Sequence, residues 1–217
     1  SCLVSFGISD DYSFEEDFKN RNNNKVLAFD PTVTNKFFLK KIIISLIQFK
    51  LNLFYNNFFN YLKFKKFFNN KENFFFKKKI GKGGSIFLSY MTIDDIIKLT
   101  EKESQIFFKI DIEGSEYRIL NDLIKYSNIT SGIVIEFHDC DLHIEKIVKF
   151  IKDINLTLVH IHTNNSDDYG VNDVPCSLEL SFSKNPIFVS NEVSFPHKLD
   201  QKNNPNVKDI ELFFSSH

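Results

Sequence analysis

Short apolar segments alternate with longer, more polar segments along the chain. The apolar segments have the length and the β-branched or aromatic character of strands, and we expect strands at 2–6, 25–29, 73–76, 85–89, 105–110, 132–137, 156–162 and 176–182. The intervening segments predict helices that begin at Ser13 and after Glu116, and helices that cover most of 34–68, 92–100 and 143–154. Ser13 and Thr92 each stand three residues before an acid, which is the pattern of a capping box.

This alternation predicts an α/β fold with about seven strands in one mostly parallel sheet and helices on both faces. The loop at 163–174 has no helix-length periodic segment, so the last two strands are expected to be antiparallel neighbours. Ligands of such sheets bind beyond the carboxyl ends of the strands. That rule selects four candidate segments, namely Gly7–Glu15, Asp30, Asp111–Glu116 and Glu136–Asp141.

The length of 217 residues allows one α/β domain, with a helical insertion at 36–79 and a C-terminal extension at 183–217. Because Ser1 already lies inside a strand-like segment, we expect the natural chain to begin further upstream. With 42% hydrophobic and 25% charged residues, the composition excludes a disordered, a collagen-like or a polytopic membrane protein. The net charge is −1, so we expect no nucleic acid partner.

The charges are segregated along the chain. Residues 36–79 hold eleven lysines and one acid, Glu72, together with many phenylalanines. One hypothesis is that this segment contacts an anionic membrane surface or a polyanionic glycan, with phenylalanine inserting and lysine meeting phosphates. The alternative is a solvated helix that compositional drift has lengthened.

The cysteines favour a reducing compartment. Cys2, Cys140 and Cys176 are an odd number and contain no C-x-x-C pair, which argues against a disulfide framework or a zinc ribbon. The longest apolar runs are far shorter than a spanning helix requires. We therefore expect a cytoplasmic protein, with peripheral membrane contact if residues 36–79 provide it.

The first two strand ends are candidates for a cofactor site. Gly7 follows the first strand and precedes a helix N-terminus, where a backbone can approach a ligand closely. The phosphate-binding pattern G-x-G-x-x-G is absent, so a nucleoside without phosphates fits better than a dinucleotide. Asp30, at the end of the second strand, could accept hydrogen bonds from both ribose hydroxyls. The alternative is an ordinary turn and an Asp-Pro pair that ends a strand.

The segment Lys109–Tyr117 points more directly to chemistry. Strand alternation places Lys109, Asp111 and Glu113 on one face, so two carboxylates would converge where the strand ends. Burial of such a pair is costly unless a cation or a proton is shared between them. The alternative is that one of these acids caps the next helix.

Several motifs resemble, in order, those of the FkbM-type family of S-adenosylmethionine-dependent methyltransferases. The family's hallmark stands here as Asp111-Ile-Glu-Gly-Ser-Glu116. Ser5-Phe-Gly-Ile-Ser-Asp-Asp11 with Phe14-Glu15 resembles its first cofactor motif, and Ala28-Phe-Asp-Pro-Thr32 resembles the second. The other matching segments, which extend the likeness over nearly the whole chain, are Thr92–Asp95, Glu136–His138, His162–Asn165, Pro175–Phe182 and Pro196–Asp200.

The resemblance implies a Rossmann-like class I methyltransferase fold that binds S-adenosylmethionine over the first strands. The cofactor-binding residues that it implies are Gly7, Ser9, Phe14, Glu15 and Asp30. It places acceptor chemistry near Asp111, Glu113 and His138, and it implies that the acceptor is a sugar hydroxyl of a glycan or a related metabolite. Two features depart from the family: the segment ahead of the first strand is absent, and residues 36–79 are unusually long and basic.

Methyl transfer to a hydroxyl requires alignment of the acceptor oxygen and removal of its proton. His138 is the candidate base, because the ordinary pKa of histidine lies nearest pH 7. The alternative is a divalent metal that acidifies the hydroxyl. Alternation places Glu136 and His138 on one strand face. It places His160, His162 and, if the strand extends that far, Asn164 on another, so the two edges could meet. The candidate metal ligands are Asp111, Glu136, His138 and His162, although their spacing matches no dedicated metal motif.

Two other functions compete with an active methyltransferase. One is a non-catalytic Rossmann-like binding module in a glycan pathway. The other is a nucleotide-sugar transferase, for which Asp139-Cys-Asp141 has the form of a metal-binding Asp-x-Asp. That function would require basic groups around a diphosphate, and the chain has only two arginines, Arg21 and Arg118.

Overall fold

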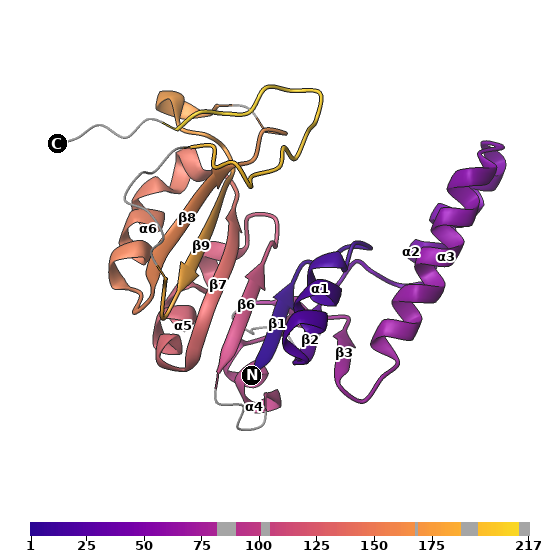
Figure 1. Ribbon diagram of the computed structural model, residues 1–217, viewed down its shortest axis with the longest axis horizontal. Coiled ribbons are helices and arrows are strands. Elements are labelled where there is room, and N and C mark those ends of the chain that lie inside the picture. Colours follow the sequence, from indigo (N-terminus) through magenta and orange to yellow (C-terminus); the bar gives the residue numbers. More distant parts are fainter. Residues whose placement is uncertain (82–89, 101–104, 168, 188–194, 213–217) are drawn as a thin grey trace. The chain divides into compact units, whose positions relative to one another are not determined.

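The computed structural model describes residues 1–81, 90–100, 105–167, 169–187 and 195–212 (Figure 1). The chain divides into two compact units, Ser1–Ile106 and Phe107–His217. Its strands form a seven-stranded sheet in the order β3-β2-β1-β6-β7-β9-β8, and two short strands, β4 and β5, pair separately. This confirms the predicted α/β class and the mostly parallel sheet of about seven strands.

The elements of the first unit are β1 Cys2–Phe6, α1 Ser13–Asn22, β2 Lys25–Phe29, α2 Asn35–Ile47, α3 Leu51–Phe68, β3 Asn73–Phe76, β4 Lys79–Ile80, β5 Tyr90–Met91 and α4 Ile93–Leu99. The next strand, β6 Ile106–Ile110, leads into the second unit. The remaining elements are η1 Glu116–Arg118, α5 Leu120–Lys125, η2 Ser127–Ile129, β7 Thr130–Phe137, α6 Cys140–Asp153, β8 Thr157–Thr163, η3 Val171–Asp173 and β9 Leu178–Ser183.

The strands β1, β2 and β3 of the first unit run parallel, and β1 and β2 are almost entirely buried. β1 pairs with β2 from Cys2 opposite Lys25 to Phe6 opposite Phe29, and β2 pairs with β3 in the same sense. Every residue of β1 is buried, which explains its continuous apolar sequence, because a parallel strand is covered on both faces. The carboxyl ends of β1 and β2 therefore lie next to each other, and the residues that follow them are neighbours.

The segment expected to be mostly helical, 34–68, forms two helices. α2 and α3 lie side by side as a hairpin (Figure 1), and the chain reverses at Phe49, whose backbone is left-handed (φ 54°). Thr34 caps α2, because its hydroxyl accepts a hydrogen bond from the Phe37 N–H at 3.0 Å. Phe38 and Phe64, near the base of the hairpin, belong to an aromatic core cluster that also includes Tyr12.

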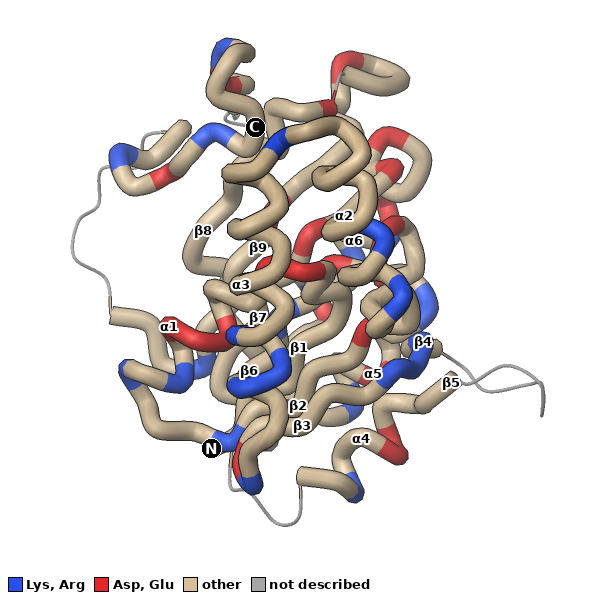
Figure 2. The backbone as a smooth tube through the Cα atoms, turned by 90° about the vertical axis from the view of Figure 1, so that its right-hand side faces the viewer, with Lys and Arg blue, Asp and Glu red and all other residues tan. Residues whose placement is uncertain are grey.

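The outer part of the α2–α3 hairpin is apolar and exposed. The side chains around the turn are mostly accessible, at 70% for Ile47, 91% for Phe49 and 61% for Leu51. Lys50 is the one charged residue between 42 and 62, so the outer part of the hairpin is largely tan in Figure 2. The lysines gather near the base, at 36, 40, 41, 63, 65 and 66.

The second unit contains the antiparallel part of the sheet. β9 lies between β7 and β8 and pairs antiparallel with both. The expectation that the last two strands are antiparallel neighbours is confirmed. Part of the C-terminal extension packs against β8, where the Thr163 hydroxyl donates to the Ile210 carbonyl at 3.0 Å and His160 Nε2 lies 2.7 Å from Asp200 Oδ1.

One of the two predicted capping boxes forms. The Thr92 hydroxyl accepts from the Asp95 N–H at 3.2 Å, and the Asp95 carboxylate accepts from the Thr92 N–H. The hydrogen bond that the Thr92 hydroxyl donates to this carboxylate lowers the pKa of Asp95. The box expected at Ser13 is wrong. There the Ser13 N–H donates to the Asp11 carboxylate at 3.0 Å, so an acid of the preceding loop performs the capping.

Three smaller expectations concern one strand, the cysteines and membrane-spanning helices. The strand expected at 85–89 lies outside the described residues, and the short pair β4 and β5 on either side was not predicted. Cys2 and Cys140 are buried, Cys176 is partly buried, and none of the three belongs to a disulfide. None of the described helices combines the length and hydropathy required to cross a bilayer.

Candidate active site

The loop between β1 and α1 turns sharply beside the end of β2. Gly7 (φ 71°) and Ser9 (φ 49°) both have left-handed backbones, a conformation that glycine adopts without steric cost. The Gly7 N–H donates to the Phe29 carbonyl at 3.0 Å, and the Ser9 N–H donates to Asp30 Oδ2 at 2.9 Å. Three of the residues predicted to bind the cofactor, Gly7, Ser9 and Asp30, are thus close together.

Asp30 is buried, and hydrogen bonds from the chain occupy both of its carboxylate oxygens. In addition to the bond from Ser9, Oδ1 accepts from the Thr32 N–H at 2.7 Å, the Thr32 hydroxyl at 2.6 Å and the Val33 N–H at 3.3 Å. Each carboxylate oxygen has about two lone-pair positions, so Oδ1 is fully used, whereas Oδ2 accepts from Ser9 alone. A ligand hydroxyl could donate to Oδ2, or to Oδ1 in place of the Thr32 hydroxyl, which can rotate away.

The other two residues assigned to the cofactor, Phe14 and Glu15, lie in the first turn of α1. Glu15 is 1% exposed, and its carboxylate accepts a hydrogen bond from the hydroxyl of Ser5 in β1. Phe14 is 37% exposed and stacks on Phe18 with 6.1 Å between ring centroids. Glu15 therefore fastens the helix to the strand, whereas Phe14 presents an accessible ring.

The β1–α1 loop and the start of α1 are acidic. Asp10, Asp11, Glu15 and Glu16 are all found in this short segment. Asp10 forms an ion pair with Lys41 of α2 at 2.5 Å. This charge distribution would repel a phosphate and attract a ligand that carries a cationic group.

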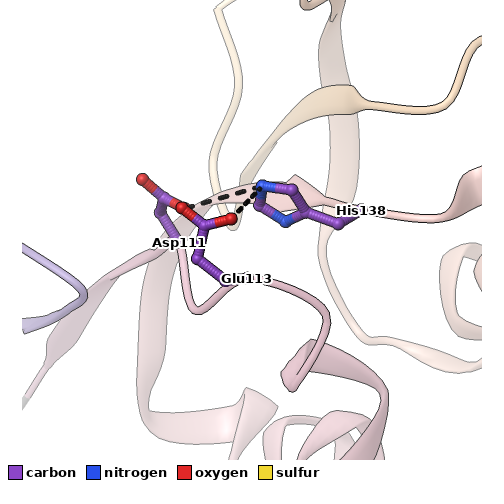
Figure 3. A group of neighbouring side chains, drawn as sticks. All are labelled: Asp111, Glu113 and His138. Atoms are coloured by element: carbon purple, nitrogen blue, oxygen red, sulfur yellow. Dashed lines mark ion pairs between the residues drawn. The ribbon is translucent and has the colours of Figure 1, made fainter. Parts of the chain in front are cut away.

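A second group of acids follows β6 in the other unit. The strand ends at Ile110, and the chain then turns through Glu113 (φ 53°) and Gly114 (φ 86°), both in the left-handed region. The expectation that strand alternation brings Asp111 and Glu113 to one face is therefore wrong in its cause, because neither residue belongs to the strand. The turn itself directs both carboxylates toward His138, which follows β7 (Figure 3).

The Glu116 side chain holds the backbone of this turn through hydrogen bonds. Its side chain is fully buried, and Oε1 accepts hydrogen bonds from the Ile112 N–H at 3.0 Å and the Gly114 N–H at 3.2 Å. The same oxygen lies 3.3 Å from His138 Nδ1. Because a carboxylate oxygen only accepts, Nδ1 is the protonated donor of this contact. The sequence analysis did not select Glu116 as a site residue, although it is the last residue of the Asp111–Glu116 motif.

Three carboxylates surround the other ring nitrogen of His138. Nε2 lies 3.6 Å from Glu113 Oε2, 3.8 Å from Glu136 Oε1 and 3.9 Å from Asp111 Oδ1. These separations exceed the 2.7–3.2 Å of an ordinary hydrogen bond. The carboxylates are therefore near enough to stabilise a positive charge on the ring, but they are too far from Nε2 to accept a hydrogen bond from it.

The pKa values of the cluster are displaced from their ordinary range. The hydrogen bond to Glu116, reinforced by the charges of Glu136 and Glu113, raises the pKa of His138 to about 9. Burial raises the pKa of Asp111, although Lys109 and His138 oppose it, and burial also raises the pKa of Glu136. At neutral pH the imidazole already holds its proton, so the carboxylates are the better proton acceptors here.

The predicted ligands on β7 and β8 separate in the structure. Glu136 joins the His138 cluster and also accepts a hydrogen bond from Asn164 at 2.7 Å. His162 instead contacts Glu179 of β9 at 3.0 Å and Asp209 at 3.5 Å. The expected meeting of the two edges is therefore wrong for the β8 histidines, because β9 lies between β7 and β8. It is confirmed for Asn164, which follows β8 and reaches Glu136.

The residues after His138 serve the local backbone. Asp139 has a left-handed backbone (φ 51°) and precedes α6, which begins at Cys140, three residues earlier than expected. Asp141 accepts a hydrogen bond from the Val171 N–H at 3.0 Å. The Tyr117 hydroxyl donates to the His138 carbonyl at 2.6 Å and holds this segment to the preceding turn. The Asp139-Cys-Asp141 pattern thus has structural partners, which weakens its reading as a diphosphate site.

The predicted site residues form two groups in the structure. Gly7, Ser9 and Asp30 lie together in the first unit, and Asp111, Glu113, Glu136 and His138 lie together in the second. A family model described as "Methyltransferase FkbM domain" matches residues 5–170 and so includes both groups. A search of curated protein sequences gave no match.

Several solved structures are similar in fold. The fibrillarin/Nop5p complex is 8% identical with a TM-score of 0.46, and the similarity covers 84% of this chain and 71% of that chain. M. capricolum TrmK bound to S-adenosylhomocysteine is 15% identical with a TM-score of 0.38, covering 85% and 62%. Precorrin-6y C5,15-methyltransferase from Geobacter metallireducens is 12% identical with a TM-score of 0.43, covering 85% and 80%. These likenesses concern the fold alone.

Proposed function

The chain belongs to the FkbM methyltransferase family, and from that premise we propose that it transfers a methyl group from S-adenosylmethionine to a hydroxyl oxygen of a sugar in a glycan or of a related metabolite. Family membership makes the protein an S-adenosylmethionine-dependent methyltransferase. The nature of the acceptor is the proposal. The observation that carries it is the cluster of Asp111, Glu113 and His138, because a hydroxyl must lose a proton when it is methylated.

The β1–α1 loop fits the cofactor in charge and in chemistry. When bound, S-adenosylmethionine supplies an electrophilic methyl group on a sulfonium, and it carries no phosphate. The acids of this loop suit a cationic ligand of that kind. We assign Gly7, Ser9, Phe14 and Asp30 to its binding, and we assign Glu15 a supporting role because it is buried against Ser5.

Within the second group we assign each side chain a separate task. Asp111 accepts the hydroxyl proton, since its raised pKa makes it a stronger base than an exposed aspartate. Glu113, whose side chain is 84% exposed, is positioned to contact the incoming acceptor. His138, held by Glu116, keeps a positive charge beside the two carboxylates.

A labelled-methyl assay tests this proposal. The full chain is incubated with S-adenosylmethionine labelled in the methyl group and a panel of sugars, glycans and hydroxylated metabolites, and the methylated atom is located by NMR. We expect methyl ethers, and loss of transfer in Asp111→Asn but not in Glu145→Gln, an exposed α6 control. Cofactor binding by calorimetry without transfer to any hydroxyl, or methylation of nitrogen or carbon only, would contradict the proposal.

We also propose that the α2–α3 hairpin rests on an anionic membrane surface, which would suit a lipid-linked acceptor. The uncharged part of α2 after Lys41 spans roughly 10 Å at 1.5 Å per residue. The turn of the hairpin is therefore far enough from the lysines to reach the depth of about 5–10 Å that apolar groups occupy at a membrane interface. With this part inserted, the lysines near the base would lie at the level of the lipid phosphates.

Vesicle co-sedimentation tests the membrane proposal. We expect binding to vesicles that contain phosphatidylglycerol, weaker binding to pure phosphatidylcholine, and loss of binding in Ile47→Asp/Phe49→Asp/Leu51→Asp. The matched control, Leu142→Asp/Val171→Asp/Leu199→Asp, changes apolar residues of similar exposure in the second unit. Equal binding to both kinds of vesicle, or unchanged binding by the hairpin variant, would overturn it.

A further inference from the structure

We propose that Asp111, Glu113 and His138 bind one divalent metal ion, with Glu136 beside it. One ligand atom from each of the three side chains lies within 4.8 Å of the others (Figure 3). Two carboxylates and one imidazole are ligands that Mn²⁺ accepts, and Mg²⁺ more weakly because it prefers oxygen. The site itself follows from geometry, and its role in catalysis rests on the proposed function.

The orientation of His138 supports a metal ligand. Metal-bound histidines donate their second ring N–H to a carboxylate or a carbonyl, which fixes the ring and leaves the other nitrogen for the metal. Here Nδ1 faces the buried carboxylate of Glu116 at 3.3 Å, while Nε2 faces Glu113 and Asp111. Glu116 is in turn fixed by two backbone N–H groups, so the imidazole is held from behind.

The spacing of the ligand atoms also fits a cation between them. Two ligands at about 2.1 Å from one ion, at right angles to each other, lie about 3 Å apart. The separations from His138 Nε2 are 3.6 Å to Glu113 and 3.9 Å to Asp111. Glu113 is largely exposed and can move inward, so a small contraction would complete the coordination.

The charges around the site are unbalanced without such an ion. Four carboxylates, those of Asp111, Glu113, Glu116 and Glu136, lie near His138. The cations that pair with them are His138 itself and Lys109, whose Nζ lies 3.8 Å from Asp111 Oδ2. A divalent ion would displace the Nε2 proton of His138, because a metal-bound imidazole is neutral, and its two charges would balance this excess of negative charge better than that one proton does.

An ion at this position would deepen the proposed reaction. A hydroxyl oxygen of the acceptor could occupy a further coordination position, where the metal lowers the pKa of the hydroxyl and eases transfer of its proton to the Asp111 oxygen that does not bind the ion. Transfer would then depend on the metal. An acceptor with a second oxygen next to the methylated one would bind best, because both oxygens could coordinate the same ion.

The test measures metal binding separately from activity. The full chain is stripped with chelator, and Mn²⁺ binding is followed by calorimetry and by electron paramagnetic resonance. We expect one bound Mn²⁺ per chain, with binding lost in Asp111→Asn and in His138→Gln. His143→Gln and Glu145→Gln, which change residues of α6 outside the cluster, should bind as the wild type does.

Glu116→Gln tests how much the carboxylate that contacts His138 Nδ1 contributes to metal binding. It keeps the size of the side chain and removes the negative charge, and we expect Mn²⁺ affinity to fall roughly tenfold or more. Circular dichroism checks that each variant is folded, and Asp111→Asn remains informative if His138→Gln is not.

The outcomes separate this inference from the proposed function. No Mn²⁺ bound at millimolar concentration, or unchanged affinity in both Asp111→Asn and His138→Gln, would overturn the metal site. Methyl transfer that continues undiminished in chelator would overturn the metal's catalytic role and leave the methyltransferase proposal standing. Mn²⁺ binding without transfer to any hydroxyl would support the site and count against the hydroxyl acceptor.

Discussion

Two loops that follow strand ends carry acidic side chains, and the hydrogen bonding of these side chains differs between the two loops. In the first unit, donors of Ser9, Thr32 and Val33 hydrogen-bond to both carboxylate oxygens of Asp30. In the second unit, Asp111 and Glu113 lie near His138 at distances too long for hydrogen bonds. The first arrangement holds two loops together. The second leaves carboxylate oxygens that a proton or a cation from outside can use.

The largest effect that this comparison predicts is on the rate of methyl transfer. Asp111→Asn removes the proposed proton acceptor, and the rate should fall about 100-fold or more, as is usual when a general base is lost. Its free energy of unfolding should change little, because the neutral side chain also removes the cost of placing a charge at this partly buried position. Steady-state kinetics and urea unfolding on one preparation measure both quantities. If Asp111→Asn kept the wild-type rate but unfolded more easily, Asp111 would have a structural role, and the roles assigned to the two loops would be wrong.

The second prediction concerns pH. Folding raises the pKa of His138 from 6.5 to about 9, so the stabilisation is complete below pH 6.5 and is lost as the pH rises through 9. In metal-free protein we expect the free energy of unfolding to decrease by about 3 kcal/mol over that range. The groups that face the imidazole are Asp111, Glu113, Glu116 and Glu136, and the shift is caused by Glu116 first and then by Glu136 and Glu113.

Urea titrations at intervals between pH 6 and pH 10, in the presence of chelator, measure this dependence. His138→Gln is the control, because it should flatten the curve across the same range. A wild-type curve that is already flat would show that the imidazole is not coupled to the carboxylates as the distances suggest.

The third prediction concerns Asp30, whose two carboxylate oxygens both accept hydrogen bonds from the chain. Asp30→Asn replaces an oxygen acceptor by an NH₂ group that faces N–H and O–H donors, so it should lower the free energy of unfolding by about 2 kcal/mol. Asp111→Asn is the matched comparison, since it makes the same change at the other loop. Thermal unfolding measures both, and equal stability of the two variants would remove the distinction on which the comparison rests.

The smallest predicted effect tests the turn that directs the acids. Gly114 has φ 86°, where a Cβ atom is strained, so Gly114→Ala should cost about 1 kcal/mol of stability. Ser115→Ala, at φ −90° in the same turn, should cost much less. Calorimetric unfolding compares them. If Gly114→Ala matches the wild type in stability and in Mn²⁺ affinity, the turn does not need its left-handed backbone.

The buried strands were the most predictable part of the fold. β1, β2 and β3 begin and end at the expected residues. β1 and β2 are buried on both faces and therefore leave mainly apolar runs, while β3, at the edge of the sheet, is marked by three consecutive phenylalanines. The break between α2 and α3 could not be predicted, since no glycine or proline marks it and Phe49 adopts the left-handed turn instead. The Ser13 capping box failed because Asp11, a better acceptor, lies two residues earlier.

The candidate site could be predicted in its composition and not in its geometry. The motif Asp111–Glu116 and the resemblance that it supports led to Asp111, Glu113 and His138. The shift of the His138 pKa could not be predicted, because it depends on Glu116, which reaches His138 from another strand end. Likewise, a sequence shows that Asp30 follows a strand but does not show that Thr32 and Val33 already bind its oxygens.

The α2–α3 hairpin has a consequence for how this chain can vary. No described residue between 43 and 60 belongs to the aromatic core cluster of the first unit, whose hairpin members lie nearer the base. Insertions, deletions and drift in composition at the turn should therefore be tolerated without loss of the fold. Shortening the hairpin across Phe49 would give a smaller protein with less exposed apolar surface, which is a practical route to concentrated samples for crystallisation.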